Sequence, residues 1–328
     1  FQAEDGIRDR SPSRGLGDVY KRQMIHISKQ IMAKTILQPL IYLAISAVTF
    51  FVCYFLAVVV SVGTIESEGL SLIMLAMYIS FAIHWILFIP SYIFQTEKFY
   101  DLTGTITYIT VLSFVVFIKQ TAVHEILDLR SLLLYSCIMI WTVRLGGFLF
   151  WRVLKDGHDI RLRTILPSFS QLFMTWTLSA AWVFIQALSA LVALSALTQV
   201  EMGIVGWIGL GLWIFGFSFQ VIADHQKTKF KSNPTNEGKF ITGGLWDLSR
   251  HPNYFGEVSL WIGISVIAVP VMTGLQYVSL ISPVFGFLLI YYVSGVRMLE
   301  DRSDKKWGEK PEYQEYKRNT PVFFPKLF

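Results

Sequence analysis

Apolar stretches long enough to cross a lipid bilayer recur along almost the whole of this chain. A transmembrane helix needs about 20 predominantly apolar residues, and a soluble globular domain has little use for several such runs. Hydrophobic residues make up 53% of the 328-residue sequence and charged residues 16%, whereas about 25% of a soluble domain is charged. The sequence therefore predicts an all-α, polytopic transmembrane helical bundle. We expect about eight spans, at residues 36–62, 70–94, 104–120, 131–151, 172–198, 203–223, 254–273 and 277–297. The third is short and follows a polar stretch, so it could instead be tilted or partly re-entrant.

The charges between the predicted spans predict the orientation of the chain. One set of loops is acidic and has few basic residues; it contains Glu66, Glu68, Glu125, Asp128 and Glu201. The alternate loops and the tail are basic, with Arg152, Lys155, Arg161, Arg163, Lys227, Lys229, Lys231, Lys239, Arg302, Lys305, Lys306, Lys317 and Arg318. Lys and Arg accumulate on the cytoplasmic side of membrane proteins. We therefore expect both termini in the cytosol and, for a eukaryotic source, the endoplasmic reticulum membrane.

Composition excludes several other classes of protein. The net charge of +5 comes from short basic segments beside apolar runs, which does not indicate nucleic-acid binding. Cys53 and Cys137 both lie inside apolar runs, so neither a disulfide framework nor a metal site is predicted. Residues 1–23 are polar and resemble a translated sequencing adapter. We expect the authentic chain to begin at Met24, with 24–328 forming one integral membrane domain.

The polar connection from Asp224 to Tyr254 has the composition of a site for a phosphate-bearing cofactor. Such a cofactor cannot lie in hydrocarbon and needs a cation-lined cleft where helix ends meet the cytosol. Gly243 and Gly244 would let the backbone approach a ligand closely. The candidate binding groups are Lys227, Lys229, Lys231, Arg250, His251, Asn253 and Tyr254. The alternative is an ordinary basic loop with Trp246 as an interfacial anchor.

Glu257 is predicted on the first turn of the seventh span, where a carboxylate needs a partner or a polar cavity. Beyond the eighth span, Arg297, Glu300 and Asp304 lie three or four residues apart and so share one helical face. We expect this face to meet the segment from Arg250 to Glu257. A solvated helix end would explain the tail charges alone, but it would not account for Glu257.

Ionisable side chains also occur in earlier spans. Arg144 lies inside the fourth span, where its charge is costly in lipid, so it should point into a cavity or toward an anionic ligand. It is followed by Gly146, Gly147, Arg152, Gly157, His158, Asp159 and Arg161. We interpret His84, in the second span, as a hydrogen-bonded helix-packing residue. Asp101 fits either an N-cap or a site residue.

Two stretches of the C-terminal half carry a family resemblance. One is Gly244-Leu-Trp followed by Ser249-Arg-His-Pro-Asn-Tyr-Phe-Gly-Glu257; the other is Ser294-Gly-Val-Arg with a tail containing Pro-Glu-Tyr-Gln-Glu-Tyr, Thr-Pro and Phe-Phe-Pro. They resemble the steroid 5-alpha-reductase C-terminal superfamily, in particular its DUF1295 branch, over about residues 101–328. The resemblance implies an oxidoreductase acting on CH–CH groups. It would use NADPH to reduce a carbon–carbon double bond in a lipid or sterol-like enone that enters from the bilayer.

The resemblance also implies roles for individual residues. Those expected to bind the cofactor are Arg144, Arg152, Asp224, Lys231, Arg250, His251, Asn253, Tyr254, Glu257, Arg297 and Asp304. The catalytic candidates are Tyr316 or a water held by Glu300 as the proton source, and Asp101 as a loose counterpart of the family's partner carboxylate. The family has a tyrosine three residues before the arginine equated with Arg144. Here that residue is Trp141, which cannot protonate an enolate, so steroid specificity is not implied.

Two other functions fit parts of the pattern. Membrane methyltransferases that use S-adenosylmethionine share an Arg-His-Pro-x-Tyr element, but they favour paired glutamates where this chain has Glu300 and Asp301. The Lys-rich segment from Lys227 to Gly238 better suits a phosphate-bearing cofactor. A transporter or non-catalytic lipid-binding protein would keep the fold, but the charges cluster at one face instead of lining a midplane path. We predict no obligate protein partner.

Overall fold

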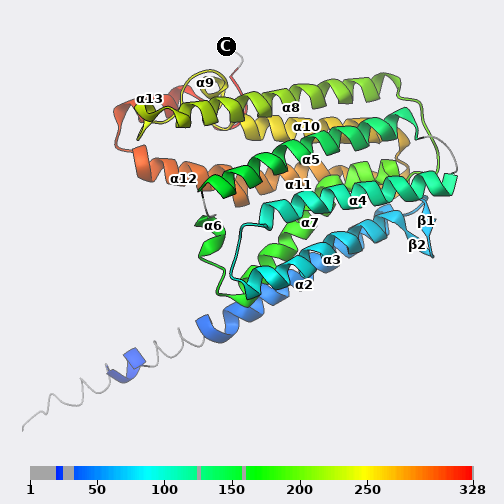
Figure 1. The fold of residues 1–328 in the computed structure, drawn as a ribbon, viewed down its shortest axis with the longest axis horizontal. Coiled ribbons are helices and arrows are strands. Elements are labelled where there is room, and N and C mark those ends of the chain that lie inside the picture. The colour runs from blue at the N-terminus through cyan, green and yellow to red at the C-terminus, as the bar shows by residue number, and fades with distance from the viewer. Residues whose placement is uncertain (1–19, 25–32, 124–126, 157–159, 327–328) are drawn as a thin grey trace, which may run out of the picture.

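The computed structural model describes residues 20–24, 33–123, 127–156 and 160–326, and its long helices form one bundle (Figure 1). The predicted all-α architecture is confirmed. Eight helices within the described residues are long and apolar enough to cross a membrane: Thr35–Val60, Leu72–Ile93, Tyr100–Ala122, Leu129–Lys155, Phe169–Leu194, Gly203–Ser232, Pro252–Val271 and Gly274–Trp307. Residues 1–19 of the predicted tail, together with Glu125, Gly157, His158 and Asp159, lie outside the described residues.

The secondary structure is helical apart from one short hairpin. The first half contains η1 (Ala33–Leu37), α2 (Gln38–Val60), β1 (Glu66–Ser67), β2 (Leu70–Ser71), α3 (Leu72–Ile93), α4 (Tyr100–Val123) and α5 (Leu129–Asp156). The second half contains α6 (Ile160–Arg163), α7 (Phe169–Leu194), α8 (Gly203–Ser232), η2 (Pro234–Asn236), α9 (Leu245–Leu248) and α10 (Pro252–Ala268). It ends with η3 (Val269–Val271), η4 (Gly274–Leu280), α11 (Ile281–Leu288), η5 (Leu289–Ser294), α12 (Val296–Trp307) and α13 (Pro311–Asn319).

The third span is a full helix and not a re-entrant segment. The turn before it is held by a hydrogen bond from the Tyr100 amide to the Glu97 carbonyl, so α4 begins four residues before Gly104. Its 24 residues are long enough to cross the bilayer. Asp101 is the second residue of this helix and lies inside the first turn, not at the N-cap, where its charge suits the positive end of the helix dipole.

Helix α7 runs through the centre of the bundle. In its most apolar window 83% of the residues are buried, compared with 22% for the first span, which lies at the periphery. The helix begins where the Ser168 hydroxyl accepts a hydrogen bond from the Gln171 amide. Both cysteines are buried, as predicted for small apolar side chains. His84 is also buried and packs against α4 and α7, which confirms its interpretation as a packing residue.

Helices α8 and α10 approach each other along a stripe of four glycines, which we call the glycine stripe: Gly209, Gly216, Gly256 and Gly263. A Cβ atom at Gly216 would lie 2.6 Å from the Gly256 carbonyl oxygen, and one at Gly263 would lie 2.7 Å from the Gly209 carbonyl oxygen. Small residues allow the backbones of membrane helices to pack this closely. The stripe thereby brings the C-terminal half of α8 beside the first turns of α10.

The eighth span is broken close to its end. A π-helical segment, η5, follows α11, and Gly295 then separates it from α12. A Cβ atom on Gly295 would lie 3.1 Å from the Tyr254 ring and closer still to the Ile290 carbonyl oxygen. Such π-helical irregularities often occur at functional sites. The break turns α12 toward the end of the bundle where α6, α9 and α13 also gather, opposite the β1–β2 hairpin (Figure 1).

Candidate active site

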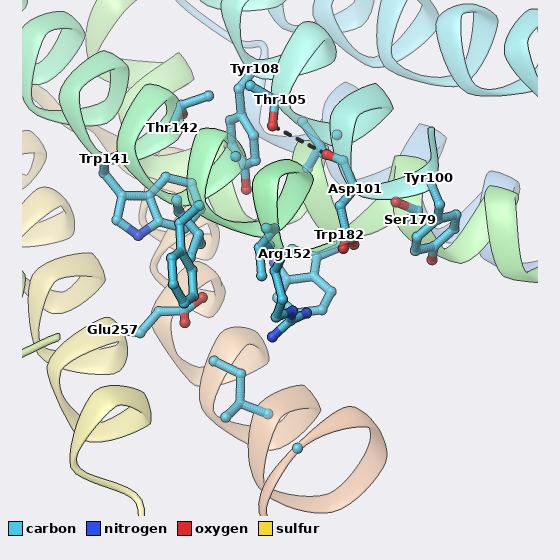
Figure 2. A pocket seen from close by; sticks show the side chains of 18 of the residues that line it. Tyr100, Asp101, Thr105, Tyr108, Trp141, Thr142, Arg152, Ser179, Trp182 and Glu257 are labelled. Carbon is cyan, nitrogen blue, oxygen red and sulfur yellow. Dashed lines mark hydrogen bonds between the residues drawn. The ribbon is translucent and has the colours of Figure 1, made fainter. Parts of the chain in front are cut away.

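A cavity of about 450 Å³ lies between α4, α5, α7, α8, α10 and the broken eighth span (Figure 2). It is bordered by both polar and apolar side chains. From the first three helices it is lined by Tyr100, Asp101, Gly104, Thr105, Tyr108, Trp141, Thr142, Leu145, Gly146, Phe148, Leu149, Arg152, Thr175, Ser179, Trp182 and Val183. Leu162, Gln220, Asp224, Asn253, Tyr254, Glu257, Ile290, Gly295 and Met298 complete the lining.

One wall of the cavity carries a hydrogen-bonded polar group from three spans. Asp224 on α8 accepts from the Arg144 guanidinium at 2.8 Å and from the Asn253 amide at 3.1 Å. Beside it, the Gln220 amide donates to the Glu257 carboxylate at 3.1 Å. Glu257 thus finds its partner on α8 and not in the tail, and it lies on the second turn of α10 because that helix begins at Pro252.

The remaining wall is largely aromatic. The Tyr108 and Trp141 rings meet edge to face with centroids 5.4 Å apart, and Trp141 packs on Trp261 at 5.0 Å. Several buried polar atoms that border the cavity have no hydrogen-bond partner in the described part of the chain: the Tyr108 hydroxyl, Trp141 Nε1, Thr142 Oγ1 and Gln220 Oε1. Buried polar groups are normally paired. Each of these atoms would therefore gain a hydrogen bond if a bound ligand reached it.

Asp101 and Arg152 lie across the cavity from Trp141 (Figure 2). Near Asp101, Ser179 lines the cavity and contacts His84 Nε2 at 3.1 Å. His84 also reaches the Ser80 carbonyl at 2.9 Å. The histidine therefore supports the wall from behind.

A second, open pocket of about 420 Å³ lies on the other side of the broken span. It is lined by Tyr292, Val293, Arg297, Met298, Asp301, Arg302 and Lys305, so three of its side chains are cationic. Arg297 does not line the first cavity, and its guanidinium stacks over the Tyr292 ring at 5.9 Å. Met298 borders both spaces, which makes them neighbours.

Glu300 ties α12 to the segment before α10. Its carboxylate accepts from Arg250 at 2.5 Å and contacts His251 Nε2 at 2.9 Å, so the predicted meeting of these two segments occurs. Neither Glu300 nor Tyr316 is among the described residues that line the cavity. Tyr316 donates to the Trp246 carbonyl at 2.6 Å, and burial raises the pKa of its hydroxyl well above the ordinary value. Their observed contacts hold the loop in place.

Other charged residues that were predicted to belong to the site lie outside the lining of the cavity. Asp304 is half exposed and pairs with Lys317 at 2.6 Å, while Lys231 is exposed near the end of α8. Trp246 is buried, which argues against the alternative in which it is an interfacial anchor. Its indole donates to the Ala223 carbonyl at 3.0 Å, and Lys227 lies over its ring. Gly244 is needed for a positive φ of 68° at the start of α9.

The last residues of the described chain cover the Arg-His-Pro-Asn segment from outside. The Arg250 amide donates to the Pro321 carbonyl at 2.9 Å, and the Ser249 hydroxyl donates to the Phe323 carbonyl at 2.8 Å. Phe323 is buried against Phe255 and Phe287. The tail thus fixes the position of the segment that presents Asn253 to the cavity.

Sequence reasoning missed the residues of the early spans that line the cavity. Tyr108, Thr142 and Trp182 carry no motif and lie in ordinary apolar runs, and Gln220 precedes the polar segment that drew attention. The available signal was weak. Gln220 lies one helical turn before Asp224, and polar side chains inside membrane spans tend to face a cavity or a partner helix.

Comparison with known families agrees with this architecture. The family model described as "Protein of unknown function (DUF1295)" matches residues 87–320, which is most of the chain. The chain belongs to this family, and the predicted resemblance is confirmed. The match includes both the polar wall and the broken span.

Several curated relatives carry functional names. Human 3-oxo-5-alpha-steroid 4-dehydrogenase 1 is 25% identical over 121 residues, 37% of this chain and 41% of its own length. Very-long-chain enoyl-CoA reductase of Dictyostelium discoideum is 36% identical over 61 residues, 19% and 20% of the two chains. Probable O-methyltransferase ustE of Ustilaginoidea virens is 35% identical over 94 residues, 24% of this chain and 33% of its own length.

These matches are partial. The chain spans between a fifth and about two fifths of the length of these relatives. These relatives are named as a dehydrogenase, a reductase and an O-methyltransferase. The eight apolar helices of the described chain fit a multi-pass membrane protein. The methyltransferase match keeps the second enzyme class under consideration.

Proposed function

We propose that this chain is a membrane-embedded reductase that uses NADPH to reduce a carbon–carbon double bond in a lipid or steroid-like substrate. The observation that carries the proposal is the adjacency of the two pockets across Met298. The first combines an aromatic wall with a polar wall, and the second is open and cationic. A dinucleotide needs both environments, one for its reactive ring and one for its phosphates.

The residues present fit such a cofactor. Arg297, Arg302 and Lys305 supply the positive charge that phosphates require, and Arg guanidinium groups bind phosphate oxygens in bidentate geometry. The unpartnered atoms of Gln220 and Thr142 match the amide and hydroxyl groups of a nicotinamide riboside. In this proposal Asn253 and Glu257 lie beside the ring, Arg297 meets phosphate, and the bound cofactor supplies a hydride.

The chain's own residues would orient the reactants and exclude water. The contacts among Arg144, Asp224 and Asn253 fix the polar wall without using water. Trp141, which packs against Trp261, would keep the opposite wall apolar and so strengthen electrostatic interactions within the cavity. Asp101 would meet a polar group of the substrate. Arg250, His251, Glu300 and Tyr316 would act indirectly, by holding the loop.

The proposal includes an orientation in the membrane. The end of the bundle that carries α9, α12 and α13 would face the cytosol, where NADPH is available, and both termini would lie on that side. The apolar part of the substrate would enter from the bilayer. In a eukaryotic cell, the endoplasmic reticulum is the proposed membrane.

The test is equilibrium binding of NADPH to the detergent-purified chain, measured by quenching of tryptophan fluorescence. Arg297→Gln removes a cation from the second pocket, and exposed Lys310→Gln is the matched control. We expect wild type and the control to bind NADPH equally and Arg297→Gln to bind about tenfold more weakly, as befits one lost phosphate contact. NADH, which lacks the 2′-phosphate, should bind less tightly than NADPH.

The same preparation separates the competing functions. Saturable binding of S-adenosylmethionine without binding of NADPH would replace the reductase with a methyltransferase. Binding of neither compound would favour a non-catalytic lipid-binding protein. Either result contradicts the proposal.

A further inference from the structure

We infer that Tyr108 on α4 is the acid that protonates the substrate carbonyl, an inference that rests on the proposed reductase function. Tyr108 lines the cavity, and its buried hydroxyl has no hydrogen-bond partner among the described residues. Figure 2 shows the side chain pointing into the cavity, on the same side as Trp141. A buried hydroxyl without a partner has lost its hydrogen bonds to water, and a bound acceptor would restore one.

The ring of Tyr108 is held on two sides. Trp141 from α5 meets it edge to face with an interplanar angle of 86°, and Trp261 from α10 lies 6.1 Å from it. These contacts leave the ring little freedom, so the hydroxyl has a defined position over the cavity. Glu257 lies within electrostatic reach of the same hydroxyl. The acid is thus placed near the polar wall, where the ring of the cofactor is proposed to lie.

Other candidate acids are less well placed. The Tyr316 hydroxyl is engaged with the Trp246 carbonyl, and the Glu300 carboxylate is engaged with Arg250 and His251. Tyr100 also lines the cavity, but its hydroxyl donates to the Thr175 carbonyl at 3.2 Å. Trp141 occupies the position of the family's tyrosine and has no acidic hydroxyl. A tyrosine on the neighbouring helix supplies the group that this position lacks.

Reduction of the conjugated double bond consumes one hydride and one proton. A bound reduced nicotinamide would supply the hydride for the β carbon of the enone, and the electron pair of the double bond would shift so that the carbonyl oxygen gains negative charge. The O–H bond of Tyr108 breaks as that oxygen takes the proton, which gives the enol. The enol tautomerises to the saturated carbonyl compound, and water returns a proton to the phenolate. The substrate class is therefore a carbonyl-conjugated alkene.

The experiment compares Tyr108→Phe with Tyr135→Phe. Tyr135 is on α5, and its hydroxyl contacts Ser113 instead of the cavity, so the control removes the same atom elsewhere. Progesterone, a 3-oxo-4-ene steroid, and trans-2-hexadecenal are the probes. Reduction is followed as NADPH oxidation, and NADPH affinity is measured separately by fluorescence. The ultraviolet band of bound progesterone reports a hydrogen bond to its carbonyl without requiring turnover.

We expect Tyr108→Phe to slow reduction by about 100-fold or more, as for loss of a general acid, with unchanged NADPH affinity. It should also remove the red shift of the bound enone band, while Tyr135→Phe behaves as wild type. Adding Trp141→Tyr to Tyr108→Phe returns a hydroxyl to the neighbouring helix and should restore part of the rate.

Undiminished reduction and an unchanged band in Tyr108→Phe would overturn the inference and leave the proposed reductase function standing. If wild type binds NADPH but neither binds nor reduces either probe, the inference is also wrong. A wild type that does not bind NADPH refutes the proposed function itself.

Discussion

Nη2 of Arg144 and Oδ2 of Asp224 lie 2.8 Å apart, and this ion pair joins the fourth span to the sixth. The same carboxylate accepts from Asn253 on the seventh span. One acidic residue thus connects three spans at the edge of the cavity. An intramembrane arginine becomes tolerable because its charge is paired and turned toward the interior.

The pair should be energetically coupled. In a double-mutant cycle of Arg144→Met and Asp224→Asn, each single change should lower the free energy of unfolding, because it leaves a charge or a hydrogen-bonding group unpaired. We expect a coupling energy on the order of 1–3 kcal/mol, measured by unfolding in mixed detergent micelles. The partly exposed pair Lys317 and Asp304 is the control and should give at most about 1 kcal/mol. Strictly additive effects at Arg144 and Asp224 would contradict the assignment.

The glycine stripe should be intolerant of even one methyl group. Gly216→Ala would place its Cβ 2.6 Å from the Gly256 carbonyl oxygen, so α8 and α10 must separate. Overpacking of this kind costs about 1–3 kcal/mol, which would appear as a lower melting temperature. The affinity for NADPH should fall as well, because Gln220 and Asn253 on this helix pair border the cavity.

The matched control is Gly211→Ala on the same helix, where no atom lies within 4 Å of the new Cβ. It should melt at the wild-type temperature or slightly above it. A Gly216→Ala protein that is equally stable would show that α8 and α10 do not depend on this close approach.

The sequence was sufficient to predict the spans because each needs a long apolar run, and a run of that length is visible without knowledge of its neighbours. The meeting of Arg250 and His251 with Glu300 could also be expected, since helical spacing places Glu300 on a defined face. The start of α4 was misjudged because polar residues at a helix end resemble a loop. Turn hydrogen bonds, not hydropathy, decide that boundary.

The lining of the cavity was mostly beyond sequence reasoning. Tyr108, Trp141 and Trp261 come from three different spans and meet through packing that leaves no local pattern. The partner of Glu257 was sought in the charged tail, yet it is the neutral Gln220 on α8. The glycine stripe determines that partnership, because it sets how closely and in which register α8 and α10 lie.

Arg130 should be important for stability and not for cofactor binding. Its buried guanidinium donates to the carbonyl oxygens of Val200, Glu201, Met202 and Ile267, which close the end of α10 and the loop before α8. In Arg130→Lys an ammonium group replaces the planar guanidinium group, and it cannot reach all four carbonyl oxygens. We expect a loss of about 1.5–3 kcal/mol in unfolding free energy with unchanged NADPH affinity. Exposed Arg318→Lys serves as the control, and an equal effect of both changes would refute the role.

The contact of His251 with Glu300 predicts a dependence of stability on pH. Burial lowers the pKa of His251; the nearby Lys227 and Arg250 lower it further, while Glu300 opposes them. The folded chain therefore keeps the imidazole neutral at pH values where an unfolded histidine, with a pKa of about 6.5, takes up a proton. The unfolded state then binds more protons, so stability falls as the pH drops below about 7, until the lowered pKa is reached.

His251→Gln tests this directly, because glutamine can still donate to Glu300 but does not titrate. We expect the melting temperature of wild type to fall more steeply between about pH 7 and pH 5 than that of His251→Gln. His225→Gln, at an exposed position of α8, should keep the wild-type slope. Parallel curves for wild type and His251→Gln would mean that the imidazole gains or loses no proton relative to the unfolded chain. In that case a neutral His251 does not stabilise the loop that presents Asn253.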